Sequence, residues 1–215
     1  RLACTARPGS TYIDTSGMWF QGGPWPYTTN DHNTQVAHWP LYAANRLDLS
    51  QPLVDALHDQ RQALIDSVEP AEWREDSAML NITTARDLYG PRFQDRRYKD
   101  LFGCLPWTLH NCWLQYRYTM DDGMLREKIY PLLRRSINLY RHILHEEDGK
   151  LRLQPTYSPE TGTFKDCNFD LGLLKWGCRT LLQAADRLEI DDPLIPTWKD
   201  ILARTPDYPV DEHGF

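Results

Sequence analysis

The sequence contains no run of apolar residues long enough to cross a bilayer, and it carries no excess of basic residues. A membrane-spanning helix needs about 20 mostly apolar residues, so we expect no membrane partner. The formal net charge of −6 and the isoelectric point near 5.6 argue against nucleic acid, because phosphate backbones are bound by basic surfaces. The chain also has no GxSxG motif, glycine-rich phosphate loop or P-loop lysine. Their absence disfavours a serine hydrolase of the GxSxG type and a nucleotide-binding fold.

Motifs for metal and redox chemistry are missing as well. The five cysteines form no CxxC pair and no zinc spacing, and their odd number argues against a complete disulfide framework. His32 and His38 are six positions apart and would not share one helical face, so we expect no metal and no cofactor. Cys112 and Cys178 lie on apolar helical faces and are expected to be buried thiols.

Aromatic residues, in contrast, are abundant. Eight Trp and eleven Tyr contribute to an aromatic share of 12%, which is typical of a large core, a stacking surface for sugar rings, or both. The 215 residues suffice for one or two domains. The chain begins with Arg1 and ends at Phe215 without a closing signal or a visible signal peptide, so we treat it as a possible fragment of a longer polypeptide.

Hydrophobic periodicity predicts an all-α fold. Residues 1–33 are rich in Gly and Pro and form a loop-rich opening segment, whereas residues 34–215 are predicted to be helical hairpins. The first helix should start near Gln35 with Asn33 or Thr34 as N-cap, and should face inward through Val36, Trp39, Ala43 and Leu47. Further helices are expected at 50–68, 107–120, 125–144, 169–188 and 194–202, with a strand-like triplet at 151–153. Helix pairs whose polar loops meet at one end describe a toroid that stops before closure.

The densest polar stretch of the sequence is residues 27–40. It combines Asp31, three side-chain amides and two imidazoles, and such groups are costly to bury unless they are hydrogen-bonded. A polyhydroxylated ligand such as a sugar could bond them, with His32 and Gln35 as candidate contacts. The alternative is that they bond one another, and that Asp31 or Asn33 only caps the helix.

Glu160 is the candidate proton donor on the opposite wall. Tyr157, Pro155 and Pro159 solvate it poorly, and desolvation raises the pKa of a carboxylic acid. The alternative is a structural carboxylate paired with Lys165. Four tryptophans could stack on sugar rings: Trp19, Trp25, Trp39 and Trp107. We expect two of the four to pack in the core instead, and we take Trp19 and Trp107 as the candidate sugar contacts.

Several motifs follow one another in a fixed order along nearly the whole chain. They are Arg7-Pro8-Gly9, Gly17-Met18-Trp19, Asn33-x-Gln35-x-x-x-Trp39-Pro40, Thr84-Ala85-Arg86-Asp87-Leu88-Tyr89-Gly90, Trp107, Trp113-x-x-Tyr116-x-Tyr118-Thr119-x-Asp121, Tyr130-Pro131-Leu132 and Pro155-x-x-Ser158-Pro159-Glu160. In this order they resemble the catalytic domain of glycoside hydrolase family 95, the inverting α-L-fucosidases and α-L-galactosidases.

The resemblance implies an (α/α)6 barrel, incomplete in this chain, with Glu160 as general acid. It also implies water activation by side-chain amides whose positions fall on Asp31 and Asn33, so that Asp31 replaces the first amide of the family. The aspartate that polarises the amide in the family is expected beyond Phe215. The family outline further favours a secreted or periplasmic protein. In an inverting pair the Glu160 carboxyl would lie about 6.5–9.5 Å from the base.

The expected function is therefore hydrolysis of a terminal α-linked L-fucose or L-galactose from a glycan, with inversion. Asn33 with Asp31 would position and deprotonate the water. Two alternatives stay open. Other toroidal sugar enzymes, such as glycoside phosphorylases, share this barrel, and a non-catalytic carbohydrate-binding scaffold could have kept the fold after losing its base.

Overall fold

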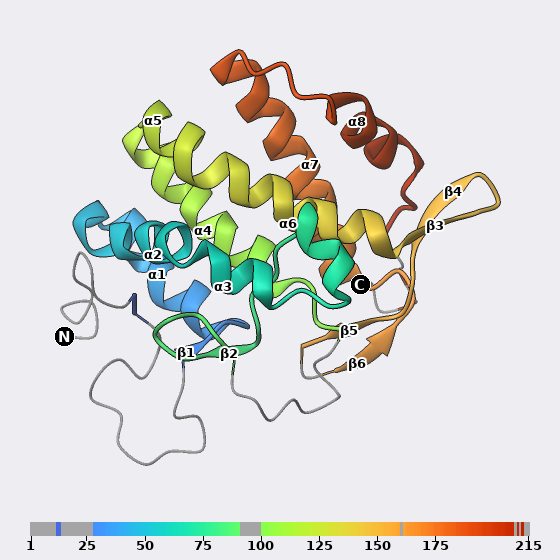
Figure 1. Cartoon of the computed structure of the whole chain (residues 1–215), viewed down its shortest axis with the longest axis horizontal. Coiled ribbons are helices and arrows are strands. Elements are labelled where there is room, and N and C mark those ends of the chain that lie inside the picture. The colour runs from blue at the N-terminus through green and yellow to red at the C-terminus, as the bar shows by residue number, and fades with distance from the viewer. Residues whose placement is uncertain are drawn as a thin grey trace.

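The computed structural model describes residues 12–13, 28–90, 100–159, 161–208, 210 and 212. Its elements are helices joined by loops and three small antiparallel ribbons (Figure 1). In chain order they are β1 (Thr28–Thr29), α1 (Asn33–Ala43), α2 (Leu47–Asp59), α3 (Arg61–Asp66), a 3-10 turn (Ala71–Glu75), β2 (Thr83–Thr84), α4 (Cys104–Thr119), α5 (Asp122–Met124), a π-helical segment (Leu125–Ile129), α6 (Tyr130–Ile143), β3 (Leu144–Glu147), β4 (Lys150–Leu153), β5 (Thr156–Ser158), β6 (Gly162–Phe164), α7 (Asn168–Leu188) and α8 (Ile195–Arg204).

The predicted helices and the strand-like triplet are confirmed. The segment predicted as one helix from 50 to 68 begins at Leu47 and is divided between α2 and α3 at Gln60. The helix predicted at 125–144 opens with the π-helical segment before α6 continues it. Most of the predicted opening segment, residues 1–33, lies outside the described residues.

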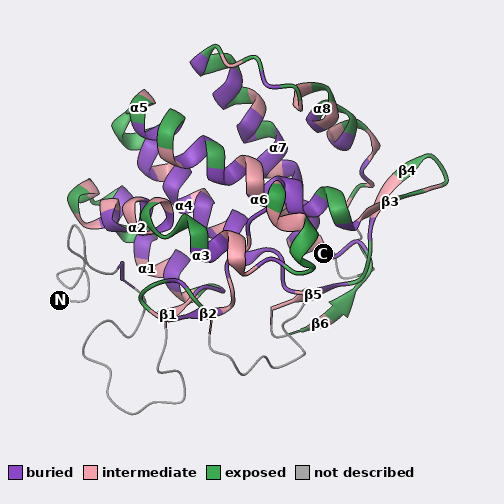
Figure 2. Cartoon of the chain, viewed as in Figure 1, coloured by how far each residue is buried: buried purple, intermediate pink, exposed green. Residues whose placement is uncertain are grey.

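Helix α4 is at the centre of the packing, because it contacts α1, α2, α6 and α7. Its predicted apolar face is buried, and Figure 2 shows the same burial continuing along α6 and α7. The buried members of the predicted face are Leu109, Cys112, Trp113 and Tyr116. Cys178 on α7 is also buried, as predicted, and burial raises the pKa of its thiol to about 12.

The prediction for the inward face of α1 is wrong. Trp39 is 43% exposed and Ala43 is exposed, whereas the buried residues are Thr34, Gln35, His38, Leu41 and Tyr42. Periodicity assumes that a buried face is apolar. Here α1 packs on polar residues of α4, so hydrogen bonds between the helices replace apolar contacts. The N-cap prediction is also wrong, because the N-cap is His32.

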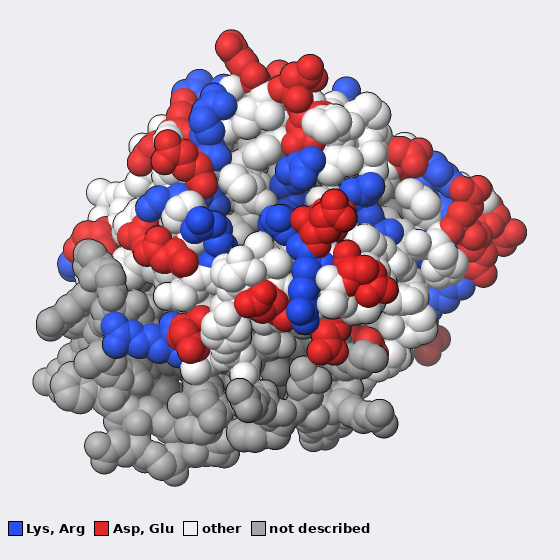
Figure 3. Space-filling model, viewed as in Figure 1, with Lys and Arg blue, Asp and Glu red and all other residues white. Residues whose placement is uncertain are grey.

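Two of the ribbons lie on the lower side of the helices in Figure 1, where they frame the starts of α1 and α7. In the first ribbon, Thr28 pairs with Thr84 and Thr29 with Thr83. In the second, β5 pairs with β6 from Thr156–Phe164 to Ser158–Gly162. On the face shown in Figure 3, acidic and basic side chains are interspersed rather than separated into patches.

Candidate active site

The first turns of α1, α4 and α7 meet at one place. Their aromatic residues form a row in which the ring centroids of His32 and Trp107 are 6.3 Å apart, and those of Trp107 and Phe169 are 5.5 Å apart in an edge-on contact. Gly103, just before α4, makes room for this row, because a Cβ atom there would lie 2.0 Å from Phe169 Cε1. The starts of three helices therefore lie together at one end of the molecule.

Asn30 fixes the chain between β1 and α1. Its fully buried side chain accepts a hydrogen bond from the Tyr12 hydroxyl at 2.9 Å. Its Nδ2 donates to the Asn81 carbonyl at 3.1 Å and to Thr84 Oγ1 at 3.0 Å, and Thr34 Oγ1 donates to its Oδ1 at 3.3 Å. Because these bonds tie the Asn30 side chain to Tyr12, Asn81 and Thr84, which are distant from it in the sequence, the backbone that leads into Asp31 has little freedom.

Asp31 and Asn33 flank a tight reversal of the chain at His32. The φ and ψ angles of His32 are 77° and −50°, and the Asn33 N–H donates to the Asp31 carbonyl at 3.0 Å. These are the features of a γ-turn with positive φ, which is rare and strained. Strain of this kind costs about 1–3 kcal/mol and gathers at functional sites. The turn places the two predicted water-activating residues next to each other in space.

Behind this turn, the predicted sugar contact Gln35 is fully buried. Its Nε2 donates to the Asn30 carbonyl at 2.9 Å and to Thr108 Oγ1 at 3.0 Å. Its own backbone carbonyl accepts from Asn111 Nδ2 at 3.2 Å. These bonds place Gln35 beneath the turn, where it holds α1 against α4.

His38 lies one helical turn below Thr34 on the buried face of α1. Burial lowers the pKa of its imidazole to about 4, although the hydrogen bond to the Thr34 carbonyl opposes this shift. The ring Nδ1 is 2.7 Å from that carbonyl oxygen and donates to it. A neutral imidazole with this geometry belongs to the packing of α1 and carries no charge near neutral pH.

The other predicted residues lie as follows. Asp31 is buried, at 7% exposure, Asn33 is half-buried, and His32 is exposed at the turn. Trp107 and Tyr157 are half-buried, and the Tyr157 N–H donates to the Asp100 carbonyl at 2.9 Å. Glu160 and Trp19, together with Trp25, lie outside the described residues.

The hairpin of β5 and β6, which spans position 160, is anchored where it leaves the sheet. Asp166 is buried and accepts from the Leu153 N–H at 2.8 Å and from Arg152 at 2.9 Å. Lys165, the alternative partner of Glu160, donates to Glu147 Oε2 at 2.5 Å. The ammonium of Lys165 is therefore engaged with a residue of the neighbouring hairpin.

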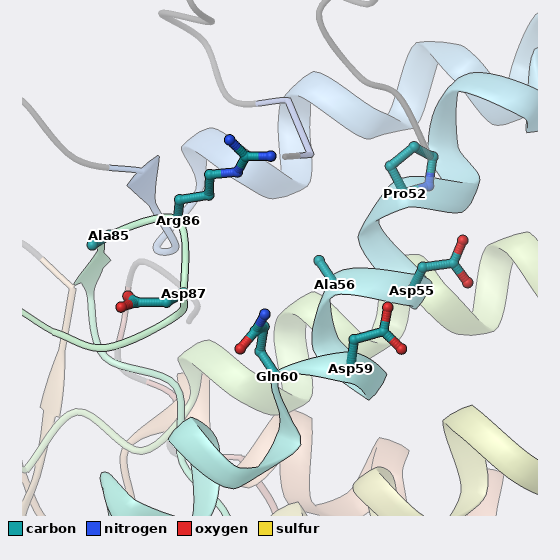
Figure 4. A pocket seen from close by; sticks show the side chains of 8 residues that line it. All are labelled: Pro52, Asp55, Ala56, Asp59, Gln60, Ala85, Arg86 and Asp87. Carbon is teal, nitrogen blue, oxygen red and sulfur yellow. The ribbon is translucent and has the colours of Figure 1, made fainter. Parts of the chain in front are cut away.

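A cavity of about 430 Å³ in the described part of the structure lies elsewhere, between α2 and the turn after β2. Asp55, Asp59 and Gln60 line one side and Ala85–Asp87 the other (Figure 4). The figure shows the carboxylates of Asp55 and Asp59 pointing away from Arg86, so these charges do not converge on one point. None of the predicted site residues lines this cavity.

Among the described residues, no helix is long and apolar enough to cross a membrane. The same residues contain no group of three or more His, Cys, Asp or Glu side chains that could hold a metal ion.

The helical hairpins, with a polar, aromatic-lined corner where three of the helices begin, have the architecture of a helical toroid. The sequence profile of the glycosyl hydrolase family 95 catalytic domain matches residues 2–215. The chain therefore belongs to glycosyl hydrolase family 95, which confirms the resemblance, and its helices are part of an incomplete helical toroid.

Two curated relatives match at lower identity. "Alpha-L-fucosidase 2" of Arabidopsis thaliana is 25% identical over 167 residues, which cover 74% of this chain and 19% of the relative. "Probable alpha-fucosidase A" of Aspergillus niger is 22% identical over 173 residues, which cover 74% of this chain and 21% of the relative. The chain spans about a fifth of the length of these relatives.

The structure adds residues that the sequence analysis did not select. Asn30, Thr108 and Asn111 form the buried support of the corner, and Asp170 lies in the first turn of α7. The signal for Thr108 and Asn111 was present, because these polar residues lie three positions apart and next to the apolar face of their helix. It was not used because such residues are usually assigned to the solvent side.

Proposed function

We propose that this chain is part of a glycoside hydrolase that removes a terminal α-linked L-fucose from a glycan with inversion of configuration. Glu160 is the general acid, and Asn33 with Asp31 holds and deprotonates the attacking water. Trp19, His32, Gln35, Trp107 and Tyr157 bind or support the sugar. Membership of the family supports hydrolysis, and the fucosidase names of both relatives favour fucose over galactose.

One observation carries the proposal. The γ-turn at His32 holds Asp31 and Asn33 on either side of it, at the corner where α1, α4 and α7 begin, and the resemblance to the family assigns the water-activating amides to these two positions. A hydrolase of this type needs a group that orients water on one side of the bond and a proton donor on the other. The half-buried rings of Trp107 and Phe169 give this corner an apolar wall on which a sugar ring can lie.

The test uses the full-length protein and aryl α-L-fucoside and α-L-galactoside. We expect faster turnover of the fucoside, and proton NMR should detect the inverted β-anomer as the first product. Glu160→Gln should abolish turnover and leave sugar binding intact, whereas Glu127→Gln, which changes an exposed carboxylate of the π-helical segment before α6, should change neither. Full activity of Glu160→Gln would rule out the assigned acid.

The same assay separates the two alternatives. A sugar phosphate released only in phosphate buffer would identify a phosphorylase. Binding of fucose without any turnover of either glycoside would identify a carbohydrate-binding scaffold. The variant Asp31→Asn restores the amide found in the family, so higher activity in this variant would show that Asp31 is a departure that weakens water activation.

A further inference from the structure

The surface turn that follows β2, residues Ala85–Tyr89, is held by two backbone hydrogen bonds and a buried anchor. The Ala85 N–H donates to the Tyr89 carbonyl at 2.9 Å, and the Leu88 N–H donates to the Ala85 carbonyl at 3.0 Å. Leu88 is only 1% exposed, and its φ angle is 64°. Positive φ is uncommon for a leucine, and strain of this kind gathers at active sites and ligand-binding segments. The turn therefore keeps one shape at the surface.

Tyr89 presents its ring at the surface in a fixed orientation. The residue is 45% exposed, and its hydroxyl donates to Oδ2 of Asp66, at the end of α3, at 2.9 Å. Its N–H donates to Asp87 Oδ1 at 3.2 Å. Because the residue is bonded at both ends, little side-chain freedom is lost when a ligand packs on the ring. An aromatic ring held in this way is suited to stack on the C–H face of a sugar.

The cavity between α2 and this turn lies beside Tyr89, because Asp87, the partner of Tyr89, lines it. Its volume of about 430 Å³ is within the range of small-molecule sites, which is about 300–1,000 Å³. The lining combines apolar and polar side chains (Figure 4). The apolar members are Pro52, Ala56 and Ala85, and the polar members are Asp55, Asp59, Gln60, Arg86 and Asp87. Such a lining fits a ligand that is itself partly apolar and partly polar.

The charges around the cavity are too dispersed to hold an ion. Figure 4 shows the carboxylates of Asp55 and Asp59 pointing away from Arg86. Asp55 also accepts from Lys128 Nζ at 2.6 Å and from Gln51 Nε2 at 3.0 Å, so its charge is already compensated. A metal ion needs several oxygen atoms aimed at one point, and a phosphate group needs converging cations. Dispersed hydrogen-bonding groups next to apolar side chains match a neutral polyhydroxylated ligand instead.

Two polar side chains of the lining are available to such a ligand. Asp59 and Gln60, at the end of α2, are exposed, and neither side chain forms a hydrogen bond or ion pair with another described residue. A carboxylate accepts hydrogen bonds, whereas an amide both donates and accepts them. Together they can therefore bond the hydroxyl groups of a sugar without breaking a contact of the fold.

The cavity and the candidate active site share the ribbon of β1 and β2. Thr84, the last residue of β2, directly precedes the turn, and its Oγ1 accepts from Asn30 Nδ2 at 3.0 Å. Asn30 directly precedes Asp31 in the sequence. Because a strand rises about 3.3 Å per residue, the turn and Asp31 lie on the order of 10 Å apart along the ribbon. A glycan of a few sugar units whose end occupies the candidate site can therefore reach the cavity.

We propose that the cavity and the ring of Tyr89 form a second carbohydrate-binding site, which holds a sugar unit of the glycan distant from the bond that is hydrolysed. The apolar lining and the Tyr89 ring contact the C–H groups of this unit, and Asp59 and Gln60 bond its hydroxyl groups. The site adds affinity for longer chains and takes no part in bond cleavage. The inference rests on the proposed function, because hydrolysis of a glycan defines the class of ligand.

The test measures how affinity depends on chain length in the full-length protein carrying Glu160→Gln, so that binding is observed without turnover. Calorimetry compares L-fucose with fucosylated oligosaccharides of two to five sugar units. We expect the longest chains to bind about fivefold more tightly than fucose or better, which corresponds to one or two net hydrogen bonds. The double variant Asp59→Ala with Gln60→Ala should lose this gain and keep its affinity for fucose.

The matched control is the double variant Gln183→Ala with Asp186→Ala, which removes an exposed amide and an exposed carboxylate from α7 and should keep the full gain. Tyr89→Phe keeps the ring and should retain most of the gain, whereas Tyr89→Leu should lose it. Thermal unfolding checks that each variant is folded. Affinity that does not depend on chain length, or a gain that survives the loss of Asp59 and Gln60, would overturn the inference.

Failure of the proposed function gives a different pattern. The unsubstituted protein would then turn over neither aryl glycoside. Binding of oligosaccharides without fucose, lost when Asp59 and Gln60 are replaced by alanine, would still identify the cavity as a carbohydrate-binding site.

Discussion

Gln35 on α1 and Thr108 on α4 are joined by a hydrogen bond of 3.0 Å between Nε2 and Oγ1, although 73 positions separate them in the sequence. The same Gln35 amide donates to the Asn30 carbonyl, and the Thr108 hydroxyl donates to the Cys104 carbonyl at 2.8 Å. One buried amide thus connects the turn that carries Asp31 to the first turn of α4. The candidate active site is assembled by polar contacts inside the core.

Replacing Thr108 by valine tests the strength of this connection. Valine matches the shape of threonine but leaves one Gln35 N–H without its acceptor, so we expect a loss of about 1–3 kcal/mol in the free energy of unfolding. Thr108→Ser keeps the hydroxyl and should lose much less. Urea unfolding measures both values, and equal losses in the two variants would show that the hydroxyl is not the relevant group.

The γ-turn predicts that position 32 tolerates glycine better than a branched residue. Glycine adopts positive φ freely, so His32→Gly should unfold at nearly the same urea concentration as the unsubstituted protein. His32→Val should lose about 1–3 kcal/mol, because a β-branched side chain disfavours this conformation. The glycine variant also isolates the imidazole: a raised KM with unchanged stability would assign sugar binding to the His32 side chain.

The row of aromatic rings predicts that substitution by alanine will change stability in opposite directions at Gly103 and Gly172. In Gly103→Ala the new Cβ would lie 2.0 Å from Phe169, so the ring must move away from Trp107. We expect a loss of about 1–3 kcal/mol and weaker sugar binding, measured by calorimetry. Gly172→Ala on α7 is the control, since its Cβ meets no atom within 4 Å. That change should stabilise the helix by about 0.5–1 kcal/mol.

Asp170 and His38 predict opposing contributions to the pH dependence of stability. The pKa of Asp170 is raised to about 6 in the folded chain, so its contribution is fully present below pH 4 and is lost as the pH rises through 6. The pKa of His38 is lowered to about 4, so its contribution is present above pH 6.5 and is lost as the pH falls through 4.

These two effects partly cancel in the unsubstituted protein, so the difference between variants is the quantity to measure. The stability that Asp170→Asn gains over the unsubstituted protein should grow between pH 4 and 6 and level off near about 3 kcal/mol. Urea unfolding at pH 4.5 and 6.5 checks this. A gain that is the same at both values would show that Asp170 does not titrate in this range.

The helices could be predicted because apolar residues repeat with helical spacing in α4, α6 and α7, where burial and low polarity coincide. The same reasoning failed for α1. Its exposed face carries Trp39, and its buried face carries Gln35 and His38, so the apolar pattern points in the wrong direction. Only the position of Thr108 and Asn111 on another helix explains why that polar face can be buried.

For the candidate site, the sequence identified the stretch around Asp31 and Asn33 but not the way in which it is held. The turn at His32 depends on backbone angles that no residue type specifies, since histidine adopts positive φ only in a minority of cases. Asp170 was overlooked because an acidic residue in the first turn of a helix is ordinarily explained by the helix dipole. Asp170 stands out because no cation among the described residues is paired with its buried carboxylate. That observation can be made only from the three-dimensional structure.

The ribbon between Thr28–Thr29 and Thr83–Thr84 has a consequence for the order of folding. Asn30 meets Thr84 only after a loop of 54 positions has closed, and a ribbon of two residues per strand returns little energy for that loss of chain entropy. The helical core of α4, α6 and α7 can form first, and the corner that holds the candidate active site can become ordered afterwards. The amide hydrogens of Asn30 and Thr84 should therefore exchange with solvent earlier than those of α4. On warming, enzymatic activity should be lost at a lower temperature than helical structure.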